Sequence, residues 1–261
     1  MPAKSRLGQN FLRDQAAIAR IAAALGDVSG QTVIEIGPGD GAITRALIER
    51  AAHLAAIELD HELALRLKAF FPQDRLTVIE QDVLDFDFAA VAQAAGHKLS
   101  VAGNLPYYIT SPILLKLAEN HTVLDRAVLM VQREVADRVT AGPGSRDYGL
   151  LSVTVQMYGP AERLFTLPPG AFSPPPEVHS SVFRWRFAPR FAELGVTEDG
   201  FLRFAKQAFA QKRKTLANNL RAAGFQAGKI QAAFAAAGIA PQARAEALSL
   251  EELAGISRHL R

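Results

Sequence analysis

Short apolar runs rich in β-branched residues recur about every 25 residues between positions 30 and 132 of this chain. These runs are Thr32–Ile36, His53–Leu59, Leu76–Glu80, Leu99–Ala102 and Ala127–Val131. The segments between them have the character of helices or loops, and strands separated in this way pair in parallel, because a parallel pair needs a long crossover connection. The rhythm therefore predicts an α/β domain with a mostly parallel sheet and helices on both faces.

The rest of the chain has a different pattern. Two further strand-like runs, Leu150–Tyr158 and Ser180–Phe187, flank a proline-rich loop at 168–176 and are predicted to extend the sheet with antiparallel strands. After Gly195 the pattern is helical throughout, and Ser249 with Glu252 forms a capping box for the last helix. We place a domain boundary near residues 188–196, which separates a domain at 1–190 from a small all-α domain at 191–261.

Composition excludes several classes of protein. The chain has 261 residues, of which 49% are hydrophobic and 21% charged, as in an ordinary soluble globular protein. It contains no run of eighteen apolar residues, so no membrane span is expected. It also has no cysteine, and its 6 histidines show no ligand spacing, so we expect no metal site and a cytoplasmic location.

Positive charge is concentrated at the C-terminal end. Residues 196–261 hold ten Lys or Arg and five Asp or Glu, a net charge of +5, against a formal +3 for the whole chain. This excess predicts that a polyanion binds the C-terminal third. If residues 201–221 form one helix, five cations fall within an arc of about 100°, and these are Arg203, Lys206, Arg213, Lys214 and Arg221.

The segment Glu35-Ile36-Gly37-Pro38-Gly39-Asp40-Gly41 is placed where the first predicted parallel strand ends and a helix begins. Three alternating glycines let the backbone turn tightly and approach a ligand at the sheet edge, so we interpret the segment as a cofactor loop. Gly37 and Gly39, followed by Ala42, also fit the dinucleotide fingerprint, and Glu58 lies where a ribose-binding acid belongs. The loop alone does not distinguish NAD from S-adenosylmethionine.

Polar residues follow the next three predicted strands. Glu58 closes the second and Asp82 follows the third, which suits a ligand with one ribose and one adenine. The fourth runs into Asn104-Leu105-Pro106-Tyr107-Tyr108, where an amide and an aromatic ring suit a planar amine as the target.

Taken in order, these motifs resemble the ribosomal RNA adenine dimethyltransferase family over essentially the whole chain. The segments that carry the resemblance are Gly8-Gln9-Asn10-Phe11-Leu12, Glu35–Gly41, Glu58, Asp82, Asn104–Tyr107, and Phe172-Ser173-Pro174-Pro175-Pro176. The resemblance implies a class I S-adenosylmethionine-dependent methyltransferase fold, with a Rossmann-like, mostly parallel seven-stranded sheet and a small helical C-terminal domain. It also implies dimethylation of the exocyclic amine of adenines, two adjacent ones, in the RNA of the small ribosomal subunit during ribosome biogenesis.

The family's roles transfer to matching positions of this chain. The expected cofactor is S-adenosyl-L-methionine, with S-adenosylhomocysteine as product and no metal, and its expected contacts are Asn10, Leu12, Gly37, Gly39, Glu58, Asp82, Val83 and Asn104. The expected catalytic residues are Asn104, Leu105, Pro106, Tyr107 and Phe172, with Phe172 on a loop stiffened by prolines and stacked on an extruded base. The expected partners are the small subunit and its RNA, bound by a monomer through Arg203, Lys206, Lys212, Arg213, Lys214 and Arg221.

Three positions depart from the family's pattern, and three competing functions stay open. Tyr108 stands where an asparagine is common in the family, and Glu177 and His179 differ from a frequent lysine and aspartate. An NAD-dependent oxidoreductase would leave the motifs at Asn104 and Phe172 unexplained. A ribosome-assembly factor without catalysis and a methylase of large-subunit RNA are the second and third competing functions.

Overall fold

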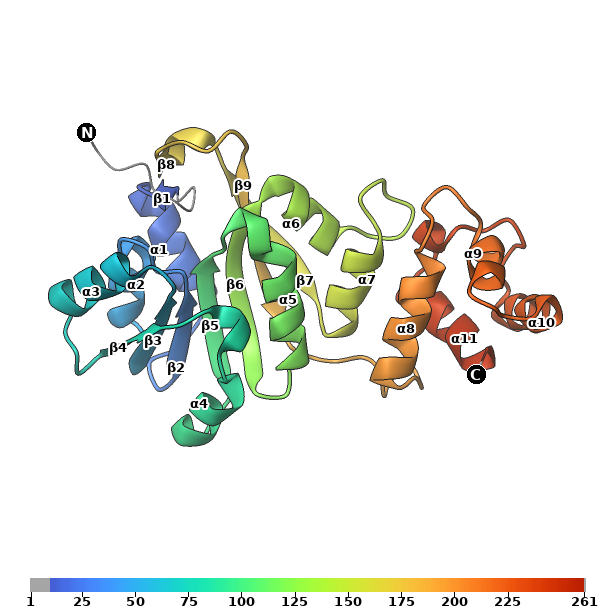
Figure 1. Cartoon of the computed structure of the whole chain (residues 1–261), viewed down its shortest axis with the longest axis horizontal. Helices are drawn as coiled ribbons and strands as arrows, with labels where there is room; N and C mark the ends of the chain where they lie inside the picture. Colours follow the sequence, from blue (N-terminus) through green and yellow to red (C-terminus); the bar gives the residue numbers. More distant parts are fainter. Residues whose placement is uncertain (1–9, 261) are drawn as a thin grey trace. The chain divides into compact units, whose positions relative to one another are not determined.

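The computed structural model describes residues 10–260, which form two compact units. The first unit contains the residues up to 136 together with 162–187, and the second contains 137–161 together with the chain from 188 onward (Figure 1). The larger part of the second unit begins at residue 188, within the boundary expected near residues 188–196. The second unit also includes residues 137–161, which the sequence analysis had placed in the first domain. The assignment of separate functions to 1–190 and 191–261 stays a prediction.

A seven-stranded sheet forms the centre of the first unit, in the order β4-β3-β2-β5-β6-β9-β7. β2, β3, β4, β5 and β6 pair in parallel, whereas β9 runs antiparallel to β6. The predictions of a mostly parallel sheet and of an added antiparallel strand at 180–187 are therefore confirmed. The strands are β2 (Thr32–Ile36), β3 (His53–Glu58), β4 (Leu76–Glu80), β5 (Leu99–Asn104), β6 (Leu124–Gln132), β7 (Ala161–Leu167) and β9 (Ser180–Arg186).

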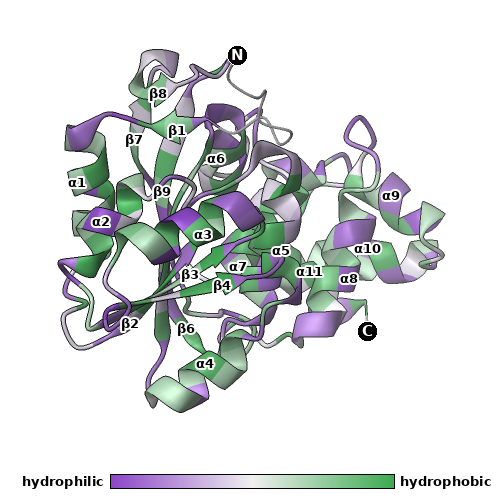
Figure 2. Ribbon diagram, turned by 60° about the vertical axis from the view of Figure 1, so that its left-hand side comes forward, coloured by the Kyte–Doolittle hydropathy of each residue, from purple (hydrophilic) through white to green (hydrophobic). Residues whose placement is uncertain are grey.

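Helices cover both faces of this sheet, as Figure 2 shows. One hydrophobic cluster joins α1 (Gln15–Ala24), α2 (Ala42–Ile48) and α3 (His61–Phe70) to inward-facing strand residues. On the other face lie α4 (Phe88–Ala95) and α5 (Thr110–Glu119). Because both faces are covered, the central strands are buried almost continuously and show no alternation of apolar and polar residues.

The order of the strands creates a switch point between β2 and β5. From β2 the chain continues outward to β3 and β4 on one side, and β5 and β6 lie on the other side. Connections that leave in opposite directions open a crevice at the carboxyl ends of the strands, where ligands bind in sheets of this kind. The two strands pass closely there, since a Cβ atom added to Gly103 would lie 2.6 Å from the carbonyl oxygen of Ile36.

A second, two-stranded sheet fastens the start of the described chain to the loop before β9. β1 (Phe11–Leu12) pairs antiparallel with β8 (Phe172–Ser173), and Leu12 lies opposite Phe172. The backbone N–H of Arg13 also donates to the carbonyl of Ala171 at 2.8 Å. This pairing holds Asn10 at the carboxyl edge of the large sheet. Gly8 and Gln9 of the same motif lie outside the described residues.

The second unit is helical in the part of the chain that the structure describes. The chain enters it within α6 (Arg133–Thr140) and continues through α7 (Leu150–Met157). The later helices are α8 (Glu198–Ala208), α9 (Leu216–Ala222), α10 (Ala227–Ala237) and α11 (Leu250–His259). The predicted capping box is confirmed, because Ser249 accepts from the Glu252 N–H and Glu252 accepts from the Ser249 N–H.

The prediction of a strand at Leu150–Tyr158 is wrong, because this segment forms α7. Its β-branched residues favoured a strand, but two side chains on one helical face decide the outcome. Ser152 donates to the carbonyl of Arg138, and Gln156 donates to the carbonyls of Val139 and Ala141. These carbonyls belong to the last turn and the end of α6, where backbone acceptors need partners from outside the helix. In a helix Ser152 and Gln156 lie about 6 Å apart, close enough to reach carbonyls of one turn, whereas in a strand they would lie about 13 Å apart.

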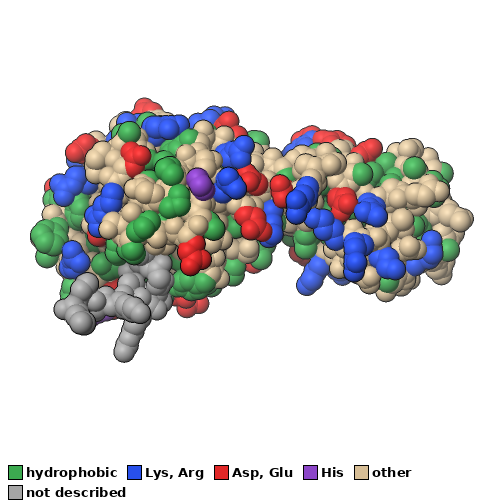
Figure 3. Space-filling view, turned by 90° about the horizontal axis from the view of Figure 1, so that it is seen from above, with side chains coloured by type: hydrophobic (Ala, Val, Ile, Leu, Met, Phe, Trp, Pro, Cys, Tyr) green, Lys and Arg blue, Asp and Glu red, His purple; other side chains and the backbone are tan. Residues whose placement is uncertain are grey.

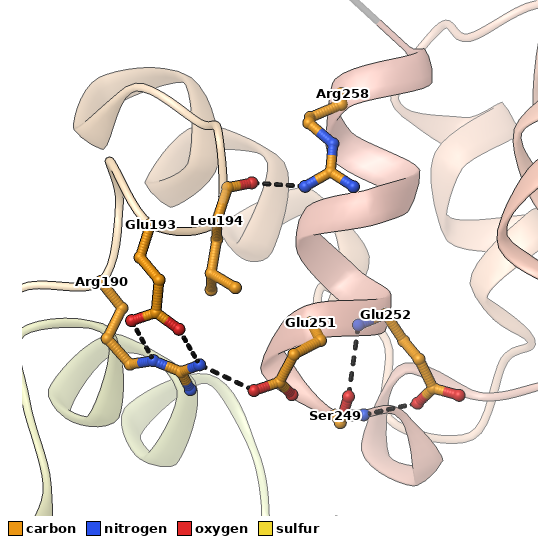
Figure 4. A network of polar contacts seen from close by, with 7 residues as sticks. All are labelled: Arg190, Glu193, Leu194, Ser249, Glu251, Glu252 and Arg258. Atoms are coloured by element: carbon orange, nitrogen blue, oxygen red, sulfur yellow. Dashed lines mark hydrogen bonds and ion pairs between the residues drawn. The ribbon is translucent and has the colours of Figure 1, made fainter.

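An exposed network joins the segment after β9 to α11 in the second unit (Figure 4). Arg190 donates to Glu193 and also to Glu251, both at 2.8 Å through the same guanidinium nitrogen. Arg258 donates to the carbonyl of Leu194. The bonds join residues that are about 60 positions apart in the sequence, Arg190 with Glu251 and Leu194 with Arg258. The network is therefore a tertiary contact at the surface.

Candidate active site

A cavity of about 340 Å³ opens at the carboxyl ends of β2, β3, β4 and β5. Its volume falls in the range of sites that bind cofactors and other small molecules. Every strand that the sequence analysis associated with a ligand contributes to it, and β1 adds a wall from the start of the described chain. The lining residues include Asn10, Phe11, Leu12, Gly37, Gly39, Glu58, Leu59, Asp82, Val83, Asn104, Leu105, Pro106, Tyr107 and Tyr108.

The glycine loop adopts a backbone that requires its glycines. Gly37, Gly39 and Gly41 have φ angles of 64°, 59° and 85°, in the left-handed region that other residues rarely occupy. The loop is also covered from above, because a Cβ atom added to Gly39 would lie 3.1 Å from the ring of Phe11. Arg13 pairs with Asp40 of the loop at 2.7 Å. The start of the described chain therefore lies directly on the loop.

Glu58 and Asp82 line the cavity beside this loop, where their strands end. Glu58 is 5% exposed, and its carboxylate accepts from the N–H groups of Gly39 at 3.0 Å and Asp60 at 2.9 Å. Burial raises the pKa of Glu58, and these N–H groups oppose that rise. Asp82 accepts from the Leu84 N–H at 2.9 Å, which fixes its side chain at the start of a 3₁₀ turn. Both carboxylates keep lone pairs for a ligand, since each has about four acceptor sites.

Asn104 stands at the end of β5 with its amide already oriented. Its Nδ2 donates to the carbonyl of Asn10 at 3.2 Å, which leaves Oδ1 as the side-chain atom that accepts. The Leu105 N–H donates to Met130 and extends the β5–β6 pairing by one residue. The hydroxyl of Tyr107 is hydrogen-bonded to that of Ser180 at 2.7 Å, and burial raises its pKa. Tyr107 is therefore neutral and held in one position.

Glu35 is a feature to which the sequence analysis gave no role. It is 1% exposed, it accepts from the hydroxyl of Thr44 at 2.6 Å, and burial raises its pKa to about 8. The hydrogen bond ties the end of β2 to α2 and so closes the glycine loop from beneath. The available signal was an acid inside a strand otherwise made of buried apolar residues. No feature of the sequence indicated that Arg13 pairs with Asp40.

Phe172 lies elsewhere than the sequence analysis expected. A ring that stacks on a base from a proline-stiffened loop would be exposed, whereas Phe172 is 4% exposed and belongs to the hydrophobic cluster under α1 and α2. The pairing of β8 with β1 turns it inward, opposite Leu12. It is not among the residues that line the cavity. Its contact with a base stays a prediction.

The predicted cationic helix over residues 201–221 is also wrong in its geometry. α8 ends at Ala208 and α9 begins at Leu216, with Thr215 capping the second helix through the N–H of Asn218. The amide of Asn219 donates to the carbonyls of Ala208 and Gln211, which holds the intervening turn. The six cations are exposed on two helices and this turn, and Figure 3 shows Lys and Arg side chains gathered on one face of the second unit. Their role in RNA binding stays a prediction.

Neither a metal-binding cluster nor a membrane-spanning helix is present among the described residues. Between residues 10 and 260, no group of three or more His, Cys, Asp or Glu side chains is arranged to hold a metal ion. Within the same range, no helix has both the length and the apolar character needed to cross a membrane.

The strand order and the position of the cavity define a class I S-adenosylmethionine-dependent methyltransferase fold, which confirms the predicted fold class. A solved structure of a dimethyladenosine transferase from Plasmodium falciparum has the same fold, with a TM-score of 0.78 and 21% identity, covering 94% of this chain and 95% of that one.

The sequence comparisons identify the family. The model of the family described as ribosomal RNA adenine dimethylase matches residues 2–261, and the chain belongs to this family. A protein of Acidobacterium capsulatum named ribosomal RNA small subunit methyltransferase A is 58% identical over 98% of this chain and 91% of its own length. A protein of the same name from Koribacter versatilis is 48% identical over 99% of this chain and 94% of its own length.

Proposed function

We propose that this chain transfers methyl groups from S-adenosylmethionine to the exocyclic amine of adenines in the RNA of the small ribosomal subunit, and that it dimethylates two adjacent adenines. The family and the names of its relatives support the substrate. The observation that carries the reaction is the oriented amide of Asn104 in the same cavity as the glycine loop. We propose that the protein acts as a monomer in the cytoplasm, where bacterial ribosomes are found.

The residues around the cavity fit the cofactor. Glu58 offers acceptors for ribose hydroxyls, and Asp82 with Val83 offers an acceptor and an apolar contact for adenine. Gly37 and Gly39 allow the methionine part to approach the backbone, with Asn10 and Leu12 covering it. When bound, the cofactor supplies a methyl group on a positively charged sulfur.

Asn104 is placed to activate the amine that receives the methyl group. The exocyclic amine of adenine is a poor nucleophile, because its lone pair is delocalised into the ring. We assign Asn104 Oδ1 and the carbonyl of Leu105 to accept the two amine hydrogens, which localises the lone pair and stabilises the positive charge that grows on nitrogen. Because Nδ2 is held by Asn10, the acceptor needs no reorientation when the amine arrives.

The base must leave its stack to reach this position. Tyr107, fixed by Ser180 and lining the cavity beside Pro106, offers a flat face to it. A second face from Phe172 requires a movement of β8 on RNA binding, because the ring is buried against the core. We assign RNA phosphate binding to the exposed cations of the second unit, which are Arg203, Lys206, Lys212, Arg213, Lys214 and Arg221.

The proposal is tested by incubating the protein with labelled S-adenosylmethionine and immature small subunits, followed by nucleoside analysis. Dimethyladenosine at adjacent positions is expected. Asn104→Ala should slow methyl transfer by about 100-fold or more, as the loss of one transition-state hydrogen-bonding group does elsewhere. Affinity for S-adenosylmethionine should stay within a few fold.

Gln93→Ala, which removes an exposed amide from α4, is the matched control and should retain full activity. A fully active Asn104→Ala protein would refute the catalytic assignment. Tight binding of NAD without binding of S-adenosylmethionine, or modification of large-subunit RNA alone, would overturn the proposed function.

A further inference from the structure

Tyr108 is a large aromatic side chain left exposed at the mouth of the cavity. It is 60% exposed and lines the same cavity as Tyr107, its neighbour in the 3₁₀ turn η2 (Tyr107–Ile109). Successive residues of a 3₁₀ turn point about 120° apart, because the turn has three residues. Tyr107 is held toward Ser180, so Tyr108 faces in another direction. The two rings therefore do not present their faces to one base from the same side.

The turn that carries Tyr108 is itself held in place. The Ile109 N–H donates to the carbonyl of Pro106 at 3.2 Å, and the hydroxyl of Thr110 donates to the same oxygen at 3.0 Å. An exposed aromatic ring on such a turn costs little conformational entropy when it binds a flat partner. The backbone that carries the ring is thus held at a defined place beside the target pocket.

The roles proposed for the other residues around the cavity do not account for the exposed ring of Tyr108. Leu59 is the other large apolar residue among the lining groups that is mostly exposed, and it follows Glu58 on the cofactor side. Phe172, the second aromatic expected at the base, is buried in the core. Tyr108 is instead joined to the target side, four residues after Asn104.

We propose that Tyr108 is a stacking platform for the nucleotide next to the target adenine; this inference rests on the proposed function. Extrusion of one adenine removes a stacking partner from its neighbour on the strand. An aromatic ring at the mouth replaces that partner, and it does so for any base, since every base has a π-face. Asparagine at this position would offer no such face.

The test compares Tyr108→Asn with Tyr108→Phe on small subunits that carry either the intact RNA or RNA lacking the base at the 5′ or the 3′ neighbour of the target. Tyr108→Asn should raise the KM for intact subunits about tenfold, which lies within the range for loss of one stacked base. Tyr108→Phe keeps the ring and should restore the wild-type KM. With RNA that lacks the stacked neighbour, Tyr108→Asn and the wild type should have the same KM.

Two controls separate this result from other effects. Leu115→Asn removes an apolar side chain of similar exposure on α5, outside the cavity lining, and should leave the KM unchanged. Affinity for S-adenosylmethionine should be the same in Tyr108→Asn and the wild type. A loss of cofactor affinity, an unchanged KM, or an equal loss of affinity on intact RNA and on both RNAs that lack a neighbouring base would overturn the inference. Failure of the proposed function would appear separately, as a wild-type protein that methylates no subunit.

Discussion

Two pairs of carboxyl groups, one pair in each unit, lie in opposite environments. In the first unit Glu35 and Glu58 are buried at the glycine loop, and burial raises the pKa of both. In the second unit Glu193 and Glu251 lie at the surface on Arg190, whose hydrogen bonds lower the pKa of both. Burial of the first pair lowers the stability of the fold at pH values where the carboxyl groups would be charged. The second pair contributes to the stability of the fold in its charged form.

This difference separates a site from a surface contact. Buried carboxyls with raised pKa values persist where a ligand needs fixed acceptors in a dry environment, so they are typical of functional sites. An exposed ion pair gives up little hydration and is screened by salt, so it contributes little to stability. The comparison predicts large, pH-dependent effects in the first unit and small, salt-dependent effects in the second.

The largest expected effect concerns Glu35. Its pKa is about 8 in the folded chain, against an ordinary 4.5, so the stability that it contributes is complete below pH 4.5 and is lost as pH rises through 8. Glu35→Gln keeps an acceptor for Thr44 without the titration. Urea unfolding should show the variant gaining on the wild type by about 4 kcal/mol between pH 4.5 and 8.

Glu49→Gln, which changes an exposed acid just after α2, is the matched control and should follow the wild-type pH profile. Parallel profiles for Glu35→Gln and the wild type would show that Glu35 is charged in the folded state.

Glu58→Ala is expected to cost about 1–3 kcal/mol of S-adenosylmethionine binding, because ribose hydroxyls lose their acceptor and the Gly39 N–H loses its partner. Calorimetry measures this loss directly. Glu62→Ala, which removes an exposed acid from the first turn of α3, should bind the cofactor normally. Unchanged affinity in Glu58→Ala would remove this carboxylate from the cofactor site.

The exposed cations of the second unit should respond to salt. Changing Arg213 and Lys214 together to Gln should lower the slope of log affinity for subunits against log salt by about 0.7 to 0.9 for each lost phosphate contact. Lys229→Gln, at an exposed position of α10 outside the assigned set, is the control. If the wild type, the double variant and Lys229→Gln all show the same salt dependence of affinity, RNA docking lies away from the turn at 209–215.

The smallest effect is expected for Glu251→Gln in the surface network. The pKa of Glu251 is lowered chiefly by its hydrogen bond to Arg190, so its contribution is present above the ordinary 4.5 and is lost as pH falls through the lowered value. Screening limits the loss to less than about 1 kcal/mol near neutral pH. Thermal unfolding should show the difference at low salt and none in concentrated salt. A difference that persists in concentrated salt would place this pair among the buried interactions.

Much of the sheet could be predicted from the sequence. Two helical segments were predicted wrongly, residues 150–158 and 201–221, because their structure depends on distant contacts. The five parallel strands and β9 were predictable because hydrophobic runs and glycine loops are local signals. β7 (Ala161–Leu167) was not predicted, and its residues are mostly exposed or half-buried. The helical state of Leu150–Met157 depends on Ser152 and Gln156 reaching carbonyls of the chain that precedes the helix by more than ten residues. The break after Ala208 depends on the buried amide of Asn219, eleven residues later. No periodicity within either segment carries that information.

The same distinction holds within the site. The glycine loop, Glu58, Asp82 and Asn104 follow successive strands, so a parallel sheet brings them to one edge. The partners that orient them are remote, since Asn104 is held by Asn10, 94 residues away, and Tyr107 by Ser180, 73 residues away. Sequence spacing therefore predicted which of these residues share one cavity, but it could not identify the partners that fix them.

The short segment around β1 contacts both ends of the cavity. Phe11 lies against Gly39, Arg13 pairs with Asp40, and the carbonyl of Asn10 holds the amide of Asn104. A ligand that favours this position of the segment at one end favours it at the other as well. If the cofactor and the target base both favour this position of the segment, reciprocity requires that each raises the affinity for the other by the same factor.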